Sequence, residues 1–227
     1  MKGRMIEFSS NGATTPGYLS APATANSPGV LLIQEWWGLV EHIRDVADRL
    51  SAEGFVVLAP DLYHGEKTKS PDTAGKLLMA LDIPRAAKEI RAAGDHLASL
   101  ENVQPKKAGV VGFCMGGQLA LYAGQEFPER VGAVVDFYGI HPNAPVDPEK
   151  LRVPVLMHFA TRDKSVPVDK AREFVERAGS SGARVQAHFY EADHAFFNDT
   201  RAEVHSPEDG STAWSRTLAF LRERLAG

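Results

Sequence analysis

A single cysteine, Cys114, stands between Gly112 and Gly116 in this 227-residue chain. Gly-x-Cys-x-Gly is the cysteine form of the Gly-x-Ser-x-Gly turn, in which a nucleophile sits between a strand and a helix. The glycines are needed because side chains two residues to either side would collide in so tight a turn. The dipole of the following helix also favours a thiolate at its N-terminus. A lone cysteine is most often a buried apolar side chain, but the flanking glycines favour Cys114 as a nucleophile.

A nucleophile in such a turn works with a histidine that an acid orients, in the chain order nucleophile, acid, histidine. Asp163 follows the apolar run 153–160, and His194 follows the apolar run 185–190. Both residues therefore stand in the required order, just past a predicted strand. Asp163 could instead cap a helix or a turn, a role that suits Asp169 better because Asp169 opens the next predicted helix.

The other histidines fit this position less well. His158 and His188 lie inside predicted strands, where a hydrogen-bonded structural role is more common, and His141 and His205 lack the required order and position. The chain has no His-Glu-x-x-His or comparable ligand spacing, so we expect no metal site. It also lacks a complete Gly-x-Gly-x-x-Gly and a Gly-Lys-Ser/Thr ending, so we expect no nucleotide and no cofactor.

The loop 33–39, with the sequence Ile-Gln-Glu-Trp-Trp-Gly-Leu, supplies further parts of the predicted site. An oxyanion hole of this type takes one backbone N–H from such a loop and one from the residue after the nucleophile. Here these residues are Trp36 and Met115. The loop also carries Glu35, whose carboxyl group would change the reactivity of a nearby thiol in a direction set by which group holds the proton. Glu35 could equally be an ordinary surface or hydrogen-bonded residue.

Alternating strands and helices must position these residues. Continuous apolar, β-branched runs predict buried strands at 30–33, 55–59, 108–113, 131–135, 153–160 and 185–190. Helical spacing of apolar residues predicts helices at 40–53, 84–100, 168–178 and 211–225.

The two ends of this pattern complete the predicted architecture. Asn11-Gly12 between two alternating segments predicts an N-terminal antiparallel hairpin. We therefore expect one α/β domain over residues 1–227: a mostly parallel twisted sheet of about eight strands, with helices on both faces. The site should lie at the C-terminal ends of the strands. Residues 64–83 are polar and aperiodic, and we expect a loop or a cap near the site there.

Composition excludes several classes of protein. With 25 basic and 29 acidic residues the net charge is −4, and 44% of the residues are hydrophobic, which is typical of a globular chain. This balance argues against nucleic-acid binding, and no apolar run approaches the roughly 20 residues that span a bilayer. The N-terminus becomes polar too early for a signal peptide, and one cysteine excludes an intramolecular disulfide. We expect a cytoplasmic monomer that acts on a small molecule, without membrane partners.

Taken together, the motifs resemble those of the dienelactone hydrolase family, in the α/β-hydrolase superfamily. Six motifs carry the resemblance by their order and spacing: Gln34-Glu35-x-x-Gly38, Pro60-Asp61-Leu62-Tyr63, the turn 112–117, Tyr138-Gly139, Asp163-x-x-Val166-Pro167 and His194-x-Phe196. The resemblance implies an α/β-hydrolase fold and a Cys114–His194–Asp163 triad. It also implies that Glu35 holds the cysteine as a thiol at rest and accepts its proton when substrate binds.

The resemblance further implies a reaction. This is the opening of the dienelactone 4-carboxymethylenebut-2-en-4-olide to maleylacetate through a thioester, in the breakdown of chlorinated aromatic compounds. One position departs from the family pattern, in which arginines bind the substrate carboxylate. One of these arginines lies four residues after the histidine, where this chain has Asn198, and Arg201 comes later.

Other cations near the predicted site are lysines rather than arginines. The stretch 64–83 contains Lys67, Lys69 and Lys76 but no arginine, and Arg85 follows it. A lysine binds a carboxylate as a point charge, without the bidentate fork of an arginine. Hydrolase chemistry is therefore a firmer expectation than dienelactone specificity.

Three alternatives stay open. The first is a general carboxylesterase or thioesterase on the same scaffold, and the second is a non-catalytic relative. The third is a thiol sensor, against which the lack of a second, resolving cysteine argues.

Overall fold

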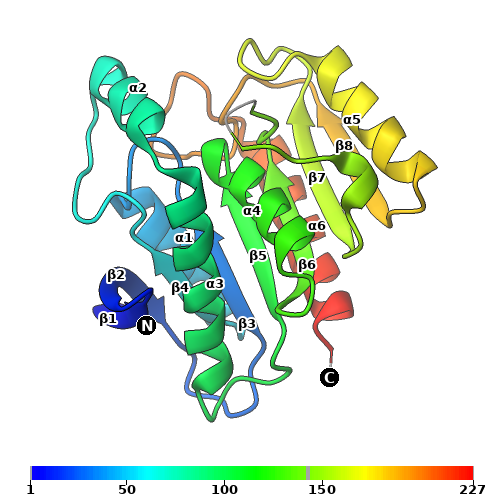
Figure 1. The fold of residues 1–227 in the computed structure, drawn as a ribbon. Coiled ribbons are helices and arrows are strands. Elements are labelled where there is room, and N and C mark those ends of the chain that lie inside the picture. Colours follow the sequence, from blue (N-terminus) through cyan, green and yellow to red (C-terminus); the bar gives the residue numbers. More distant parts are fainter. Residues whose placement is uncertain (1, 142–143, 227) are drawn as a thin grey trace.

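The sheet of this protein positions the loops in which the predicted site residues lie. The structure is a computed structural model that describes residues 2–141 and 144–226. One sheet holds eight strands in the order β1-β2-β4-β3-β5-β6-β7-β8 (Figure 1). Their bounds are β1 Arg4–Ser10, β2 Ala13–Ser20, β3 Gly29–Ile33, β4 Val56–Pro60, β5 Ala108–Phe113, β6 Val131–Phe137, β7 Val155–Ala160 and β8 Val185–Tyr190.

The first two strands form the antiparallel hairpin that the sequence predicts. β1 pairs with β2, and β2 pairs with β4, in antiparallel register, whereas the remaining pairs from β4 to β8 are parallel. The hairpin turn has Asn11 at φ 51° and Gly12 at φ 79°. Positive φ at both central residues is what a two-residue hairpin turn requires, and Asn-Gly adopts it readily.

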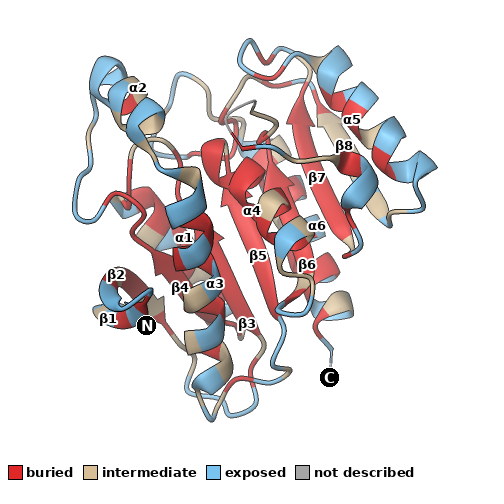
Figure 2. Cartoon of the chain, in the orientation of Figure 1, coloured by how far each residue is buried: buried red, intermediate tan, exposed pale blue. Residues whose placement is uncertain are grey.

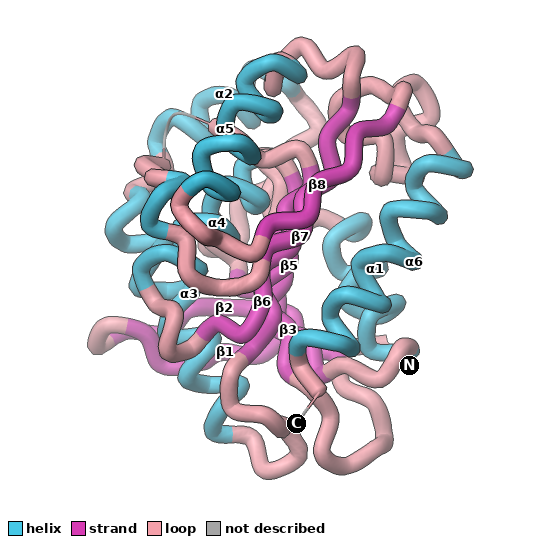
Figure 3. Tube along the Cα trace, turned by 90° about the vertical axis from the view of Figure 1, so that its right-hand side faces the viewer, coloured by secondary structure: helices cyan, strands magenta, loops and turns pink. Residues whose placement is uncertain are grey.

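Helices cover both faces of the sheet. Their bounds are α1 Glu41–Ala52, α2 Pro71–Ala80, α3 Ile83–Ser99, α4 Met115–Glu126, α5 Val168–Ser180 and α6 Pro207–Arg224, with a short 3₁₀ helix at Pro148–Lys150. Figure 3 shows α1 and α6 on one side of the sheet, with α3, α4 and α5 on the other. None of the helices in the described residues is long and apolar enough to cross a membrane.

Two hydrophobic cores result, one on each face. Consecutive residues of a strand point to opposite faces, so Leu31 of β3 packs in the core with Ile90 of α3, and Leu32 packs in the core with Ile43 of α1. The central strands are accordingly buried along their whole length (Figure 2). This is the physical reason for the continuous apolar runs from which the sequence predicts these strands.

Several predicted bounds differ from the structure by a few residues, as for the helix predicted at 211–225, which begins at Pro207. Two differences have a clear physical cause. The stretch 64–83 contains α2, which Ser70 caps by accepting a hydrogen bond from the Thr73 N–H at 3.5 Å. Ala74 is the one buried residue of this helix, so no apolar periodicity reveals it. The predicted strand 153–160 begins only at Val155, because the proline before it has no N–H to donate to a neighbouring strand.

Candidate active site

Cys114 occupies a sharp turn between the end of β5 and the start of α4. Its backbone has φ 54° and ψ −120°, and a positive φ is uncommon for a residue other than glycine. The Cys114 N–H donates to the Phe137 carbonyl at 2.9 Å, and the Gly117 N–H donates to the Cys114 carbonyl at 3.0 Å. Such strain is typical of functional sites, where surrounding contacts hold it. The half-buried thiol thus stands at the C-terminal edge of the parallel strands.

The two glycines around Cys114 allow backbone segments to approach each other closely. A β-carbon at Gly112 would collide with the Gly116 carbonyl, and one at Gly116 would collide with the carbonyls of Ile33 and Gln34. Because these are backbone atoms, they cannot move aside as the end of a flexible side chain can. This is the steric requirement that the sequence pattern predicts.

Asp163 and His194 come from the loops after β7 and β8. His194 Nδ1 lies 2.6 Å from Asp163 Oδ2. The other oxygen, Asp163 Oδ1, accepts hydrogen bonds from the N–H groups of Ser165 at 2.7 Å and Val166 at 2.9 Å. Asp163 therefore stabilises its own turn and orients the imidazole at the same time. Asp169 lies in the first turn of α5, as expected.

His194 connects this pair to the cysteine. Its Nδ1 contacts Asp163, and Cys114 lies close enough to influence its pKa. Burial disfavours the imidazolium, but the hydrogen bonds and charges of Asp163 and Cys114 outweigh burial and raise the pKa of His194 to about 10. The fold thus brings together three residues from distant parts of the sequence, in an arrangement that favours an imidazolium at His194.

The backbone N–H groups of Trp36 and Met115 are the predicted oxyanion donors. Neither the Trp36 N–H nor the Met115 N–H donates a hydrogen bond to a residue in the described part of the chain. Met115 is the first residue of α4, so its N–H also lies at the positive end of the helix dipole. These are the two positions from which the sequence analysis expects oxyanion donors.

Glu35 is buried, with 1% of its surface exposed, and is not a surface residue. Its Oε2 accepts a hydrogen bond from Asn198 Nδ2 at 3.0 Å, whereas its Oε1 has no partner among residues 2–141 and 144–226. Thr200 holds the amide in turn, since its N–H and hydroxyl donate to Asn198 Oδ1 at 3.1 and 2.7 Å. The residue that departs from the family pattern therefore orients Glu35, which sequence reasoning missed.

Tyr138 and Asp136 also adjoin the site, and sequence reasoning did not single out either one as functional. The Tyr138 ring centre lies 5.0 Å from that of His194. Burial, followed by the charges of Glu35 and Cys114, raises the pKa of Tyr138 well above its usual value. Burial likewise raises the pKa of Asp136, at the end of β6, well above its usual range. The Tyr138-Gly139 motif was a visible signal, but nothing local shows that the tyrosine turns inward.

His158 has the structural role that its place in a strand predicts. It is fully buried in β7, with Nδ1 2.9 Å from the Tyr190 hydroxyl and Nε2 3.1 Å from the Thr217 hydroxyl. Burial, followed by the charges of His188 and Arg216, lowers the pKa of His158 well below its usual value. Within the described residues, no group of three or more histidine, cysteine, aspartate or glutamate side chains could hold a metal ion.

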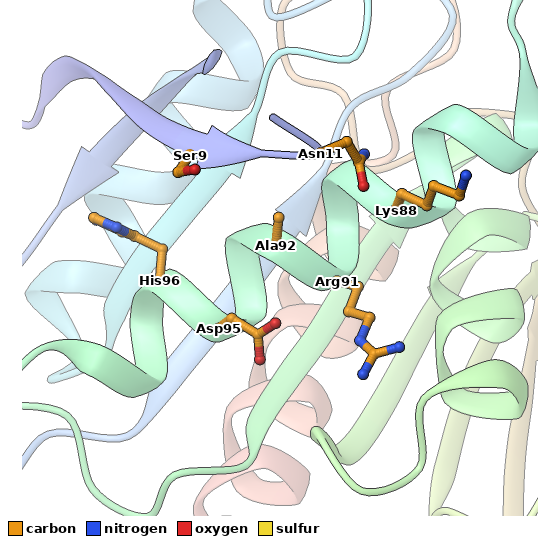
Figure 4. Close-up of a pocket in the computed structure, with 7 residues that line it drawn as sticks. All are labelled: Ser9, Asn11, Lys88, Arg91, Ala92, Asp95 and His96. Carbon is orange, nitrogen blue, oxygen red and sulfur yellow. The ribbon is translucent and has the colours of Figure 1, made fainter. Parts of the chain in front are cut away.

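Two hollows differ in their relation to the site. A cavity of about 320 Å³ adjoins it through Asn198 and Trp37, and it is also lined by Lys69 and Arg201. A groove of about 660 Å³ lies between the β1–β2 hairpin and α3; Figure 4 shows its lining residues Ser9, Asn11, Lys88, Arg91, Ala92, Asp95 and His96. The groove includes none of the residues around Cys114. The cavity does not include Cys114, Asp163 or His194 either, but it is lined by Asn198, which hydrogen-bonds Glu35.

Only some of the cations that could bind a substrate carboxylate line this cavity. Arg201 lies over the Trp37 ring at 5.5 Å and donates from Nε to Glu203 Oε1 at 2.9 Å. Lys69 lines the same cavity, whereas Lys67, Lys76 and Arg85 do not. Arg85 instead donates to Glu89 at 2.8 Å.

A mostly parallel sheet with a Gly-x-Cys-x-Gly turn after β5, and with Asp163 and His194 after β7 and β8, is the arrangement of the α/β hydrolases. Comparisons with known proteins identify the family. The dienelactone hydrolase family matches residues 15–225 of this chain. The protein therefore belongs to that family and is a hydrolase.

Similar proteins match over almost their full lengths. Protein usf of Aquifex pyrophilus is 37% identical, over 98% of this chain and 99% of its own. A protein of Aquifex aeolicus with the provisional name carboxymethylenebutenolidase is 35% identical, over 98% and 99%. The crystal structure of a provisionally assigned dienelactone hydrolase from Klebsiella pneumoniae superposes with a TM-score of 0.88 at 27% identity, covering 96% of this chain and 97% of that one.

Proposed function

We propose that this protein is a cysteine-dependent hydrolase that opens a lactone or an activated ester through a thioester acyl-enzyme. The observation that carries the proposal is the set of contacts from Asp163 through His194 to Cys114, with 2.6 Å between the first pair. The proposed catalytic residues are Cys114, Asp163, His194 and Glu35.

In the proposed acylation, the Cys114 thiolate attacks the carbonyl carbon of the substrate. The N–H groups of Trp36 and Met115 stabilise the developing oxyanion, and each such donor is typically worth roughly 3–4 kcal/mol. Collapse of this intermediate releases an enolate or alkoxide and leaves an acyl group on the sulfur. A thiol suits leaving groups that need little protonation, so we expect activated esters and lactones rather than simple amides as substrates.

Acylation prepares the enzyme for hydrolysis. The charge of Cys114 is one cause of the raised pKa of His194. A thioester at Cys114 has no charge, so acylation removes this cause. The imidazolium can then give its proton to the released enolate or alkoxide, and the neutral imidazole becomes a base. Oriented by Asp163, His194 activates a water molecule that attacks the thioester.

The leading substrate is the dienelactone, with maleylacetate as the product, in the breakdown of chlorinated aromatic compounds. The provisional name of the Aquifex aeolicus relative supports this choice. The dienelactone carries a carboxylate, and the net charge of this protein is −4, so attraction of the substrate needs local cations. Arg201 and Lys69 are the cations that line the adjoining cavity, and we propose that they bind the carboxylate.

The test compares the wild type with Cys114→Ala on p-nitrophenyl acetate and on the dienelactone. We expect activity to fall about a thousandfold or more on both substrates, because the nucleophile is lost. Mass spectrometry of the wild type should find an acetyl group on Cys114. A folded Cys114→Ala variant with full activity on both substrates overturns the proposal.

A general carboxylesterase or thioesterase is the second candidate. Asn198 favours it, because the amide of this residue is occupied by Glu35 and offers no positive charge to a carboxylate. A panel of neutral esters, thioesters and the dienelactone distinguishes the two candidates. A value of kcat/KM that is higher for the neutral esters selects the general hydrolase.

We also propose that residues 1–227 form a single domain that works as a cytoplasmic monomer. All eight strands lie in one sheet, which supports a single domain. A free thiol nucleophile is best preserved in a reducing compartment, which supports the location. Size-exclusion chromatography with light scattering tests the oligomeric state.

A further inference from the structure

Several buried polar atoms around the site lack hydrogen-bond partners within the described residues, among them Gln34 Nε2 and both Asp136 oxygens. Two of these atoms, one from Tyr138 and one from Glu35, are complementary. Tyr138 Oη carries a donor proton, and Glu35 Oε1 is an acceptor. Both residues are buried, with exposed fractions of 0% for Tyr138 and 1% for Glu35. An unpaired buried polar group costs about 1–3 kcal/mol, and most such groups in native proteins have a partner. Tyr138 follows β6 and Glu35 follows β3, at the sheet edge that also carries Cys114, so an unpaired donor and an unpaired acceptor there require a functional explanation.

Both side chains are held in place. Asn198 binds Glu35 Oε2 at 3.0 Å, which leaves Oε1 as the free oxygen. The Tyr138 N–H donates to the His158 carbonyl at 2.8 Å, and φ of 45° turns the residue out of line with β6. The Tyr138 ring packs against His194 at 5.0 Å between ring centres. Because packing fixes both groups, neither can rotate freely to another partner.

The surroundings of the Tyr138 hydroxyl are acidic. After burial, the charges of Glu35 and Cys114, in that order, contribute most to raising the pKa of Tyr138. The phenol therefore keeps its proton throughout the neutral range and stays a hydrogen-bond donor. This places a permanent donor among the groups that take part in the proposed reaction.

We propose that Tyr138 Oη and Glu35 Oε1 bind the water molecule that hydrolyses the thioester. This inference rests on the proposed function, because it needs an acyl group on Cys114. The Tyr138 hydroxyl donates to one lone pair of the water. The water donates one hydrogen bond to Glu35 Oε1 and the other to neutral His194. Its second lone pair then points at the thioester, which is the orientation that attack requires.

In the proposed hydrolytic step, each bond and each proton is accounted for. The water oxygen forms a bond to the thioester carbonyl carbon while one water proton passes to His194. The tetrahedral intermediate then collapses, the carbon–sulfur bond breaks, and the Cys114 thiolate leaves beside the new imidazolium. The product is a carboxylic acid that retains the second water proton until it ionises into solvent. Tyr138 and Glu35 orient the water without gaining or losing a proton.

The test separates hydrolysis from acylation with p-nitrophenyl acetate and Tyr138→Phe, which removes only the hydroxyl oxygen. We expect an unchanged burst of p-nitrophenolate, a steady-state rate about tenfold lower, and accumulation of acetyl-Cys114 by mass spectrometry. Added hydroxylamine should restore turnover, because a strong nucleophile depends less on being positioned. Tyr122→Phe in α4 removes the same atom outside the site and should behave as the wild type.

A second variant keeps the inference testable if Tyr138→Phe does not fold. In Glu35→Gln, the Asn198 amide still needs an acceptor, so the new amide oxygen takes the place of Oε2 and its NH₂ takes the place of Oε1. The water then loses its acceptor, and the acetyl group should leave Cys114 about tenfold more slowly. A slower burst in Tyr138→Phe, or loss of the acetyl group at wild-type rates in both variants, overturns the inference. A wild type without an acetyl group on Cys114 contradicts the proposed function itself.

Discussion

Asn198 and Glu35 lie 163 residues apart in the sequence and form a buried hydrogen bond of 3.0 Å from Nδ2 to Oε2. The bond joins the loop after β3 to the loop after β8, and these loops also carry Trp36 and His194. Thr200 fixes the amide by donating to Asn198 Oδ1. Glu35 is therefore oriented by a neutral group at the position where the family pattern has an arginine.

Removing this amide should disturb Glu35 more than it disturbs the fold. In Asn198→Ala the buried carboxyl group loses its donor, which costs about 1–3 kcal/mol of stability. We expect kcat/KM for p-nitrophenyl acetate to fall about tenfold or more, because the orientation of Glu35 is lost. Steady-state kinetics and urea unfolding measure the two effects. Asn102→Ala is the matched control, and equal kinetics in both variants would contradict a role for Asn198.

Asp163→Asn should lower the pKa of His194. The hydrogen bond and charge of Asp163 help to raise this pKa to about 10, compared with about 6.5 in an unfolded chain. In the wild type the resulting stabilisation is fully present below about pH 6.5 and is lost as the pH rises through about 10. NMR signals of the wild-type His194 ring should therefore remain those of an imidazolium at neutral pH.

In Asp163→Asn the same NMR signals should titrate at lower pH, with a fall in kcat of about a hundredfold or more. The ring signals of His188 provide an internal control, because Asp163 is not among the causes of its lowered pKa. A His194 titration that the substitution leaves unchanged would argue against the Asp163 contact in solution.

Asp136→Asn should leave the protein at least as stable as the wild type at neutral pH. The carboxyl group is packed so closely that a β-carbon at Gly117 or Gly139 would collide with it. Burial raises its pKa well above the usual value, so the unfolded chain ionises first and the stability of the wild type falls as the pH rises above about 4. Thermal unfolding at neutral pH and near pH 4 measures this difference. Asp169→Asn is the exposed control, and a strong loss of stability in Asp136→Asn that is confined to neutral pH would show that ionised Asp136 is required.

Arg201→Ala should discriminate between charged and neutral substrates. Arg201 lines the cavity beside Asn198, and loss of its charge weakens binding of a carboxylate. We expect KM for the dienelactone to rise about tenfold or more, and KM for p-nitrophenyl acetate to stay unchanged. Arg152→Ala, at the opposite end of β7, is the control. An equal effect on both substrates would exclude carboxylate binding by Arg201.

Gly116→Ala should destabilise the turn that holds Cys114. Its β-carbon would collide with the carbonyls of Ile33 and Gln34, so β3 and α4 must move apart. We expect a loss of several kcal/mol in urea unfolding, as for other severe packing conflicts, and no measurable esterase activity. Gly179→Ala in α5 meets no atom within 4 Å and should be neutral or slightly stabilising. A stable, active Gly116→Ala protein would contradict this account of the turn.

Much of the architecture could be predicted from local sequence. Strands buried on both faces need apolar residues at successive positions, so runs such as 30–33 and 108–113 identify them. The turn at Cys114 could be predicted because the steric need for glycine acts within five residues of sequence. Helix α2 could not, since burial of Ala74 alone leaves no periodic pattern.

The sequence by itself determined the order of strands and helices, the turn at Cys114, and the positions of Asp163 and His194 after their strands. Only the tertiary structure decided that Asn198 orients Glu35, that the hydroxyl of Tyr138 has no partner within the described residues, and that Asp136 is buried. The physical reason is the distance along the chain over which each kind of interaction acts. Periodicity and turn chemistry act between residues a few positions apart, whereas these contacts arise where loops from separate strands meet at one edge of the sheet.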